Sequence, residues 1–233
     1  MGLSMERVSK KLIATLIAGL TVAPAANAAF VMKLDDLGDG APAMVIYDGS
    51  GSDLGGPAGV ITYSGSVGAF SVNVTTGISK PVVGPAQLDL NSINVSGASG
   101  SLLVSITDTD FSGNYAGFNA AYGGTTDGVV DLTFDYDLNN QEFGSNPFAS
   151  GGHTAAPGDI AFSDDLFGSV ALGSPFSLTI SALIAHDAAG QVTSFDAAVS
   201  PVPVPLPAAF WLFGSALVGY GFHRGFAKHS NPI

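Results

Sequence analysis

Two clusters of acidic and amide side chains have the spacing best suited to chemistry in this sequence. The first cluster follows a D-x-D-x-N pattern, and its metal ligands would be Asp135, Asp137 and Asn139. Asn140 follows it and suits the left-handed turn conformation usually adopted by glycine. The second cluster follows an apolar run: Asp108, Asp110 and Asn114. Oxygen ligands without histidine or cysteine suit Ca²⁺, the one cofactor for which the sequence offers candidate ligands. The alternative is that both clusters are solvated strand faces and turns.

The histidines do not complete a catalytic pattern. His223 and His229 lie near the C-terminus, which leaves His153 in a glycine-rich stretch and His186 beside Asp187. No G-x-S-x-G or comparable turn accompanies either of the last two. The many aspartates would allow a paired-carboxylate glycosidase, but nothing marks a cleft. We therefore predict a protein that is not an enzyme. A secreted hydrolase is kept as the third alternative, after the two hypotheses given below.

Aromatic side chains at 115–122 offer a different chemistry. The stretch 114–124 reads NYAGFNAAYGG, and we predict a loop there because of its glycine, alanine and asparagine content. Its rings could present flat apolar faces to sugars: Tyr115, Phe118 and Tyr122. The alternative is that these rings pin a long loop to the body of the protein.

Alternating apolar and polar residues predict the strands that would hold these groups. In 131–139 (DLTFDYDLN), alternate residues share one face: Leu132, Phe134, Tyr136 and Leu138. The other strands expected are 44–47, 60–63, 70–74, 88–95, 102–107, 167–172, 176–184 and 192–199. Short strands separated by glycine-rich turns predict an all-β fold, a single β-sandwich or jelly-roll-like domain over residues 29–200.

The charge of the chain is divided unevenly. The 233 residues carry a net charge of −12, but 29–203 holds 18 acidic residues against two lysines, a balance of −16. A nucleic-acid partner is excluded because it requires a basic face. The absence of cysteine excludes a disulfide scaffold, a thiol nucleophile and a cysteine-ligated metal.

The N-terminal segment 1–28 is typical of a secretory signal peptide. Its positive region contains Arg7, Lys10 and Lys11. Residues 12–22 form an apolar stretch, Pro24 follows, and small side chains at Ala26 and Ala28 predict cleavage after Ala28. The expected partners are the Sec export machinery and signal peptidase. A permanent anchor is the alternative, but eleven apolar residues rise only ~17 Å as a helix.

The C-terminal segment predicts a membrane anchor. Prolines at 201, 203, 205 and 207 predict an extended spacer over 201–207. Residues 208–222 carry no charge, so we predict a transmembrane helix over 208–223 and a short basic cytoplasmic tail over 224–233. The alternative is a buried helix at the end of a soluble domain.

The motif at the start of this anchor resembles a known sorting signal. It consists of Val204, Pro205, Leu206, Pro207 and Ala208, followed by the apolar segment and basic residues. This order is similar to the VPLPA variant of the PEP-CTERM family. The resemblance implies export, a transient stay in the inner membrane, and recognition by an exosortase that releases or transfers the protein to the cell surface. The family usually ends in an arginine cluster, whereas the C-terminal tail of this chain has a single arginine, Arg224.

These observations lead to one functional hypothesis and an alternative. The first is a non-enzymatic surface or biofilm-matrix protein of a Gram-negative bacterium, sorted by an exosortase and associated with exopolysaccharide. The alternative is a lectin-like carbohydrate-binding module of the cell surface. Strand edges without lysines leave self-assembly open.

Overall fold

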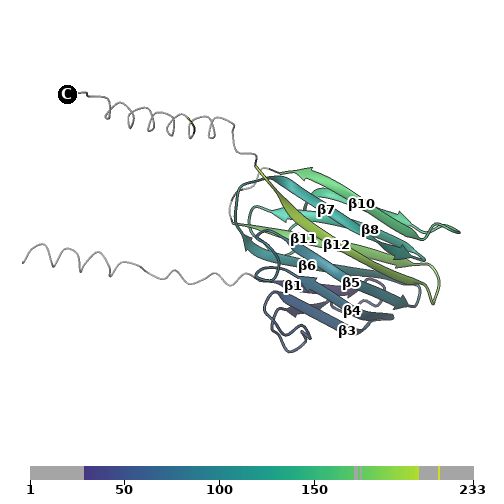
Figure 1. Ribbon diagram of the computed structural model, residues 1–233. Helices are drawn as coiled ribbons and strands as arrows, with labels where there is room; N and C mark the ends of the chain where they lie inside the picture. The colour runs from purple at the N-terminus through teal and green to yellow at the C-terminus, as the bar shows by residue number, and fades with distance from the viewer. Residues whose placement is uncertain (1–28, 171–172, 174, 205–214, 216–233) are drawn as a thin grey trace, which may run out of the picture.

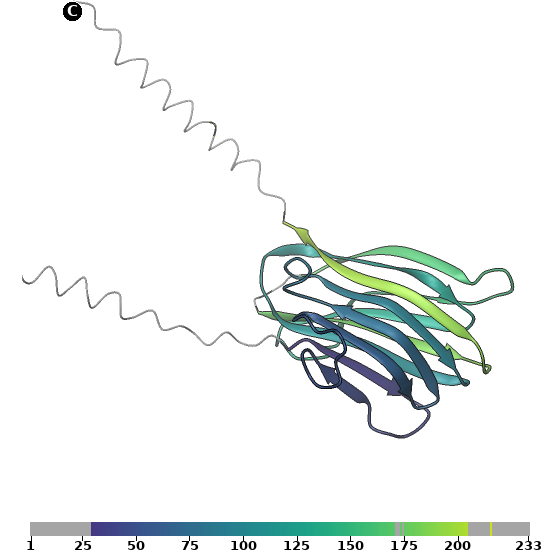
Figure 2. The ribbon, with the colours of Figure 1, turned by 60° about the horizontal axis from the view of Figure 1, so that its bottom comes forward.

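The computed structural model describes residues 29–170, 173, 175–204 and 215. The strands, which lie within residues 31–203, form an antiparallel two-sheet sandwich (Figures 1 and 2). The all-β sandwich predicted from the sequence is therefore confirmed. The predicted signal peptide with Ala26 and Ala28 lies outside the described residues, as does the sorting motif beyond Val204. In the described part of the chain, no helix is long and apolar enough to cross a membrane.

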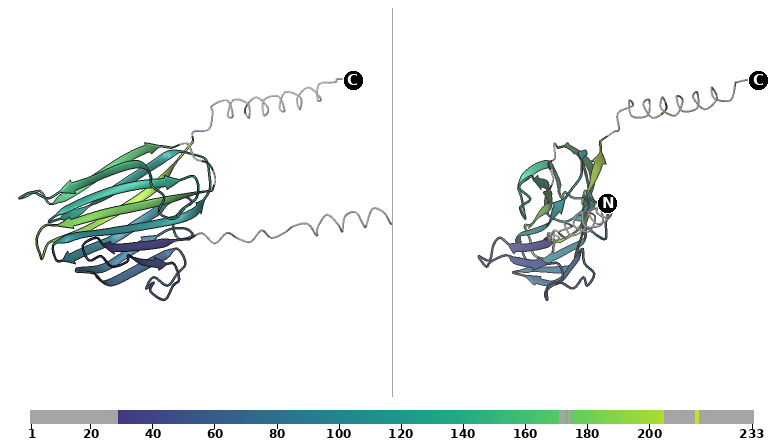
Figure 3. Two further views of the ribbon diagram at one scale, coloured as in Figure 1. Left: turned by 180° about the vertical axis from the view of Figure 1, so that it is seen from behind. Right: turned by 90° about the vertical axis from the view of Figure 1, so that its left-hand side faces the viewer.

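Sheet A has six strands in the order β2-β1-β6-β11-β8-β9. Their bounds are β1 Val31–Asp36, β2 Met44–Tyr47, β6 Gly100–Phe111, β8 Val129–Asp137, β9 Asn146–Thr154 and β11 Phe176–His186. Every neighbouring pair is antiparallel. The left panel of Figure 3 shows this sheet from behind the view of Figure 1.

Sheet B also has six strands, in the order β10-β7-β12-β5-β4-β3. Their bounds are β3 Val60–Val67, β4 Phe70–Ile78, β5 Leu88–Gly97, β7 Tyr115–Thr126, β10 Ala161–Ser169 and β12 Val192–Pro203. These pairs are antiparallel too. Three of the twelve strands, β1, β7 and β9, were not predicted from the sequence, and β10 begins six residues before the strand predicted at 167–172.

The core lies between the sheets and is built mostly from alternate residues of the strands, because successive side chains point to opposite faces. Its largest fully buried side chains are Phe70, Phe111, Phe118, Phe134, Phe176, Met32, Leu34, Ile46, Ile61, Leu88, Leu90 and Ile93. Each such side chain contributes about 1.5–3 kcal/mol when it leaves water. The core is thus large enough to stabilise the sandwich without disulfides.

Strand β12 ends in prolines that the sequence assigned to a spacer. Pro201 and Pro203 pair with β7, whereas the pairing of β12 with β5 ends at Val199. A proline has no N–H to donate, so it fits a strand only where that side is unpaired. The sheet therefore extends to Pro203, three residues beyond the predicted boundary at 200.

Both ends of the sandwich chain lie at the same end of the molecule. The Ala29 N–H donates to Thr109 Oγ1 at 2.9 Å, near the end of β6. Pro203 pairs with Tyr115 at the start of β7, which follows β6 directly along the chain. The opposite end carries the turns that join β5 to β6, β7 to β8 and β11 to β12.

Candidate functional site

The aromatic residues predicted to contact sugars pack within the core or against it instead. Residues 115–126 form strand β7, so Phe118 is fully buried and Tyr122 is only 8% exposed. Tyr115 packs on Phe118 with ring centroids 5.7 Å apart, and its hydroxyl donates to the Ser112 carbonyl at 3.2 Å. The interpretation as a sugar-binding loop was wrong, because pairing with β10 and β12 holds this stretch as a central strand.

The outer face of sheet B carries a shallow groove of about 630 Å³. Its lining combines small residues with carboxylates: Ala121, Gly123, Ala197, Ala198, Asp89, Asp164, Asp165 and Asp196, together with Tyr122 and Ser163. Small side chains leave the backbone of β7 and β12 open to a close approach by a ligand. No lysine, arginine or histidine is among the described residues that line it.

The strand register explains how the carboxylates come to flank this groove. Asp165 of β10 lies opposite Ala121 of β7, Ala121 opposite Ala198 of β12, and Ala198 opposite Asp89 of β5. One row across four strands therefore reads Asp-Ala-Ala-Asp. The two outer carboxylates are three strand spacings apart, about 14 Å along the row. In the next row, Gly123 lies opposite Asp196.

The carboxylates of the groove differ in their surroundings. Asp196 accepts a hydrogen bond from the Ser92 N–H at 2.6 Å. Asp89 is half-buried, and burial raises its pKa, with the charge of Asp196 adding to the increase and a hydrogen bond with Asn91 opposing it. The groove is thus an anionic surface that offers hydrogen-bond acceptors to a ligand rich in donors.

An exposed aromatic ring stands on the same face of sheet B. Phe167 lies two residues after Asp165 on β10 and is 57% exposed. A Cβ added at Gly117 would lie 2.9 Å from two atoms of its ring, so the ring rests against the buried backbone of β7. One side of the ring is fixed by this contact while much of the side chain remains open to solvent. The sequence offered a signal for it, since Phe167 shares the polar parity of Ser163 and Asp165.

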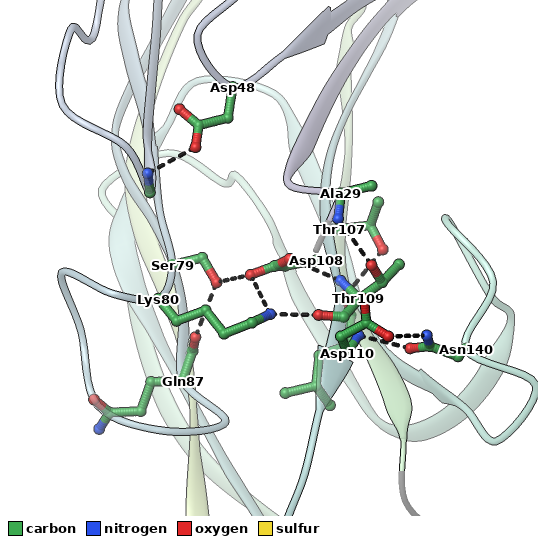
Figure 4. A network of polar contacts seen from close by, with 12 residues as sticks. Ala29, Asp48, Ser79, Lys80, Gln87, Thr107, Asp108, Thr109, Asp110 and Asn140 are labelled. Atoms are coloured by element: carbon green, nitrogen blue, oxygen red, sulfur yellow. Dashed lines mark hydrogen bonds and ion pairs between the residues drawn. The ribbon is translucent and has the colours of Figure 1, made fainter. Parts of the chain in front are cut away.

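The predicted calcium cluster at Asp108 and Asp110 is occupied by protein groups (Figure 4). Asp108 is 1% exposed and accepts hydrogen bonds from Ser79 Oγ at 2.5 Å and from Lys80 Nζ at 2.8 Å. Asp110 Oδ1 accepts a hydrogen bond from Asn140 Nδ2 at 2.7 Å. Each carboxylate therefore has its own partner, and the lysine ammonium of the network stands where a cation would have been expected.

The predicted cluster at Asp135, Asp137 and Asn139 forms a covered turn. Asp135 and Asp137 are each 7% exposed, and burial raises the pKa of Asp135. Asp137 Oδ1 accepts from the Asn139 N–H at 2.7 Å, as in a turn that an aspartate caps. Across the described ranges, no group of three or more histidine, aspartate or glutamate side chains is placed to hold a metal ion.

Comparison with known proteins finds only distant similarity in structure. No protein-family model matches the chain, and no curated protein matches it. TmCBM61, solved in complex with beta-1,4-galactotriose, is 11% identical with a TM-score of 0.35, and the match covers 64% of this chain and 91% of that one. A mutant of the family 29 carbohydrate-binding module CBM29-2 is 14% identical with a TM-score of 0.27, covering 77% and 98%.

Proposed function

We propose that the sandwich is a non-catalytic carbohydrate-binding module, with its site on the outer face of sheet B. The observation that carries the proposal is the exposed ring of Phe167, fixed on Gly117 beside the row of Asp165 and Asp89. An aromatic face packs against the C–H groups of a sugar ring, and neighbouring carboxylates accept hydrogen bonds from its hydroxyls. A few polar groups around an apolar contact are the usual composition of a small-ligand site.

The position of the site on strands favours selective binding. Its side chains come from β5, β7, β10 and β12, which are held by ladder hydrogen bonds on a packed core. Groups held on rigid strands lose little conformational entropy when a ligand binds. The alanines and glycine of the floor allow the ligand to lie across the strands.

The charge of the groove defines the class of polysaccharide. All four charged residues that line it are aspartates. A polymer of uronic acids or sulfated sugars would bring like charges against them, which opposes binding. Neutral sugars instead supply hydroxyl donors. The proposed ligand is therefore a neutral polysaccharide.

The proposed setting is the cell surface, reached by export and by sorting through the VPLPA motif. The arrangement of the chain ends supports this setting, because Ala29 and Pro203 lie at one end of the sandwich. A C-terminal anchor would therefore leave the outer face of sheet B open to the exopolysaccharide. Mass spectrometry of the C-terminus of surface-purified protein tests the sorting, and an intact Ile233 would contradict it.

Affinity gel electrophoresis of the full chain tests the proposed ligand class. The gels contain neutral polysaccharides or a polyuronate, and the detergent lacks sugar headgroups so that it cannot compete. We expect at least one neutral polymer to retard the protein, equally at low and high salt, because the contact does not depend on opposite charges. We expect no retardation by the polyuronate. Retention by the polyuronate alone, or by no polymer in a broad panel, would contradict the proposal.

A further inference from the structure

A buried histidine joins the two sheets at the end of the sandwich opposite the chain ends. His186 is the last residue of β11 in sheet A and is 3% exposed. Its Nε2 lies 3.0 Å from Thr193 Oγ1 of β12 in sheet B. Its ring also packs at 5.9 Å from that of Phe70 of β4 in sheet B. One side chain of sheet A therefore contacts two strands of the opposite sheet.

The contact with Thr193 continues as a chain of hydrogen bonds. Thr193 Oγ1 lies 2.7 Å from Thr126 Oγ1 of β7, and both threonines are buried. The Gly128 N–H donates to Thr126 Oγ1 at 3.0 Å. The Thr126 hydroxyl can thus donate to Thr193 Oγ1, and the Thr193 hydroxyl can donate to Nε2 of His186. In that arrangement the imidazole is neutral, Nε2 accepts, and the proton is on Nδ1.

The other nitrogen of the ring has no partner. Nδ1 of His186 is buried without a hydrogen bond to any described residue. A protonated imidazole donates from both nitrogens, so protonation would reverse the bond at Nε2 and place a charged N–H in the apolar interior. An unpaired buried charge is far more costly than an unpaired neutral group.

The charged groups near His186 do not compensate for this cost. Asp127, in the turn between β7 and β8, is exposed, and its Oδ2 accepts from the Val192 N–H at 3.1 Å. Asp187, directly after the histidine, is exposed as well. Neither aspartate forms an ion pair with the ring among the described residues. In the part of the chain that the structure describes, the strands packed around His186 contribute only residues without a titratable side chain. These are Gly100 of β6, Phe70 of β4, Thr126 of β7 and Thr193 of β12.

We infer that His186 is an acid-sensitive latch between the sheets: its protonation breaks the link to Thr193 and loosens this end of the sandwich. Burial lowers the pKa of His186, although the charges of Asp127 and Asp187 oppose the shift. The folded protein therefore binds this proton less readily than the unfolded chain does. The stability from a neutral His186 is complete above about pH 6.5, the ordinary value for histidine, and is lost as the pH falls below it.

Thermal melting of the full chain at pH 7.5 and 5.5 tests the latch, using His186→Gln and, as the matched control, His153→Gln. His153 is the other described histidine and lies half-buried on β9. We expect the wild type and the control to lose about 2–4 °C more in Tm over this interval than His186→Gln. Comparison between variants is needed because the half-buried Asp89 and the buried Asp108 and Asp135, whose pKa values are raised, change stability in the opposite direction at lower pH. An equal loss in all three proteins would overturn the inference.

An NMR titration of the wild type keeps the inference testable if the variant does not fold. The His186 ring proton is expected to titrate below pH 6.5, together with shifts at the amides of Thr193 and Thr126. Titration at or above pH 6.5, or without any change at the two threonines, would overturn the latch.

Discussion

Replacement of Lys80 by methionine is expected to lower the free energy of unfolding by about 3 kcal/mol at neutral pH. Lys80 Nζ is 2.8 Å from Asp108 Oδ2, contacts the Thr109 carbonyl and lies 4.0 Å from the centroid of the Phe111 ring. Removing one partner of a buried ion pair leaves an uncompensated charge and costs about 3–5 kcal/mol. The lower end applies because the Lys80 side chain is itself 27% exposed. Urea unfolding of both proteins measures the difference.

Lys33→Met is the matched control for this substitution. Lys33 is the other lysine of the described sandwich, and it lies over the Phe143 ring at 4.8 Å on the outer face of sheet A. A cation–π contact between half-buried residues at the surface contributes about 1 kcal/mol, so the control should lose about a third as much stability. Equal losses in the two variants would contradict the account of Asp108 as a buried, paired carboxylate.

The deficit of Lys80→Met should shrink in acid. Burial already raises the pKa of Asp108, against the lowering effects of the hydrogen bonds from Lys80 and Ser79 and of the lysine charge. The stability associated with such a carboxyl is present when it is protonated and is lost as the pH rises through the folded-state pKa. Without the lysine this pKa rises further. Unfolding curves from pH 7 to 4 should therefore converge, and a constant difference would contradict the explanation.

The sequence was sufficient to predict the sandwich because its clearest strand obeyed simple alternation. In β8, Leu132 and Phe134 are buried and Asp131 and Thr133 are exposed, as the pattern required. The burial of Asp137 in the same strand could not be predicted. A Cβ added at Gly144 would meet Asp137 Cβ at 2.3 Å, so the connection to β9 folds back over the strand. Alternation within a strand carries no information about such a cover.

Strand β7 shows why the candidate site was missed. Its alanine, glycine and asparagine residues have low strand propensity, and the sequence reads as a loop. The strand exists because β10 and β12 pair with it on both sides. The same small residues form the floor of the groove and make room for the ring of Phe167 over Gly117. The small residues of this stretch therefore marked an open surface, but their composition did not predict the strand that forms it.

Tertiary pairing also decided the role of the other predicted ligands. Lys80 is 28 positions away from Asp108, and Asn140 is 30 positions from Asp110. Motif spacing finds groups that are near in the chain, whereas these partners meet only after the sheets form. The burial of His186 likewise depends on partners distant in the sequence or in the opposite sheet, because Phe70 and Thr193 contact its ring.

Replacement of Phe167 by alanine is expected to weaken polysaccharide binding about thirtyfold. An aromatic side chain at the centre of a binding site commonly contributes about 2 kcal/mol, and 1.4 kcal/mol corresponds to tenfold in affinity. The fold should tolerate this change, because Phe167 is 57% exposed and its ring lies beside Gly117, which has no side chain to lose contact. Tyr47→Ala is the matched control, since Tyr47 is 49% exposed but lies on β2 of sheet A.

Calorimetric titration of the neutral polysaccharide that retards the protein most strongly tests the central claim most directly. The wild type, Phe167→Ala and Tyr47→Ala are compared after equal melting temperatures show that all three are folded. The account predicts that Phe167→Ala binds about thirtyfold more weakly while Tyr47→Ala binds like the wild type. Wild-type affinity in Phe167→Ala, or an equal loss in both variants, would contradict a sugar-binding site on the outer face of sheet B.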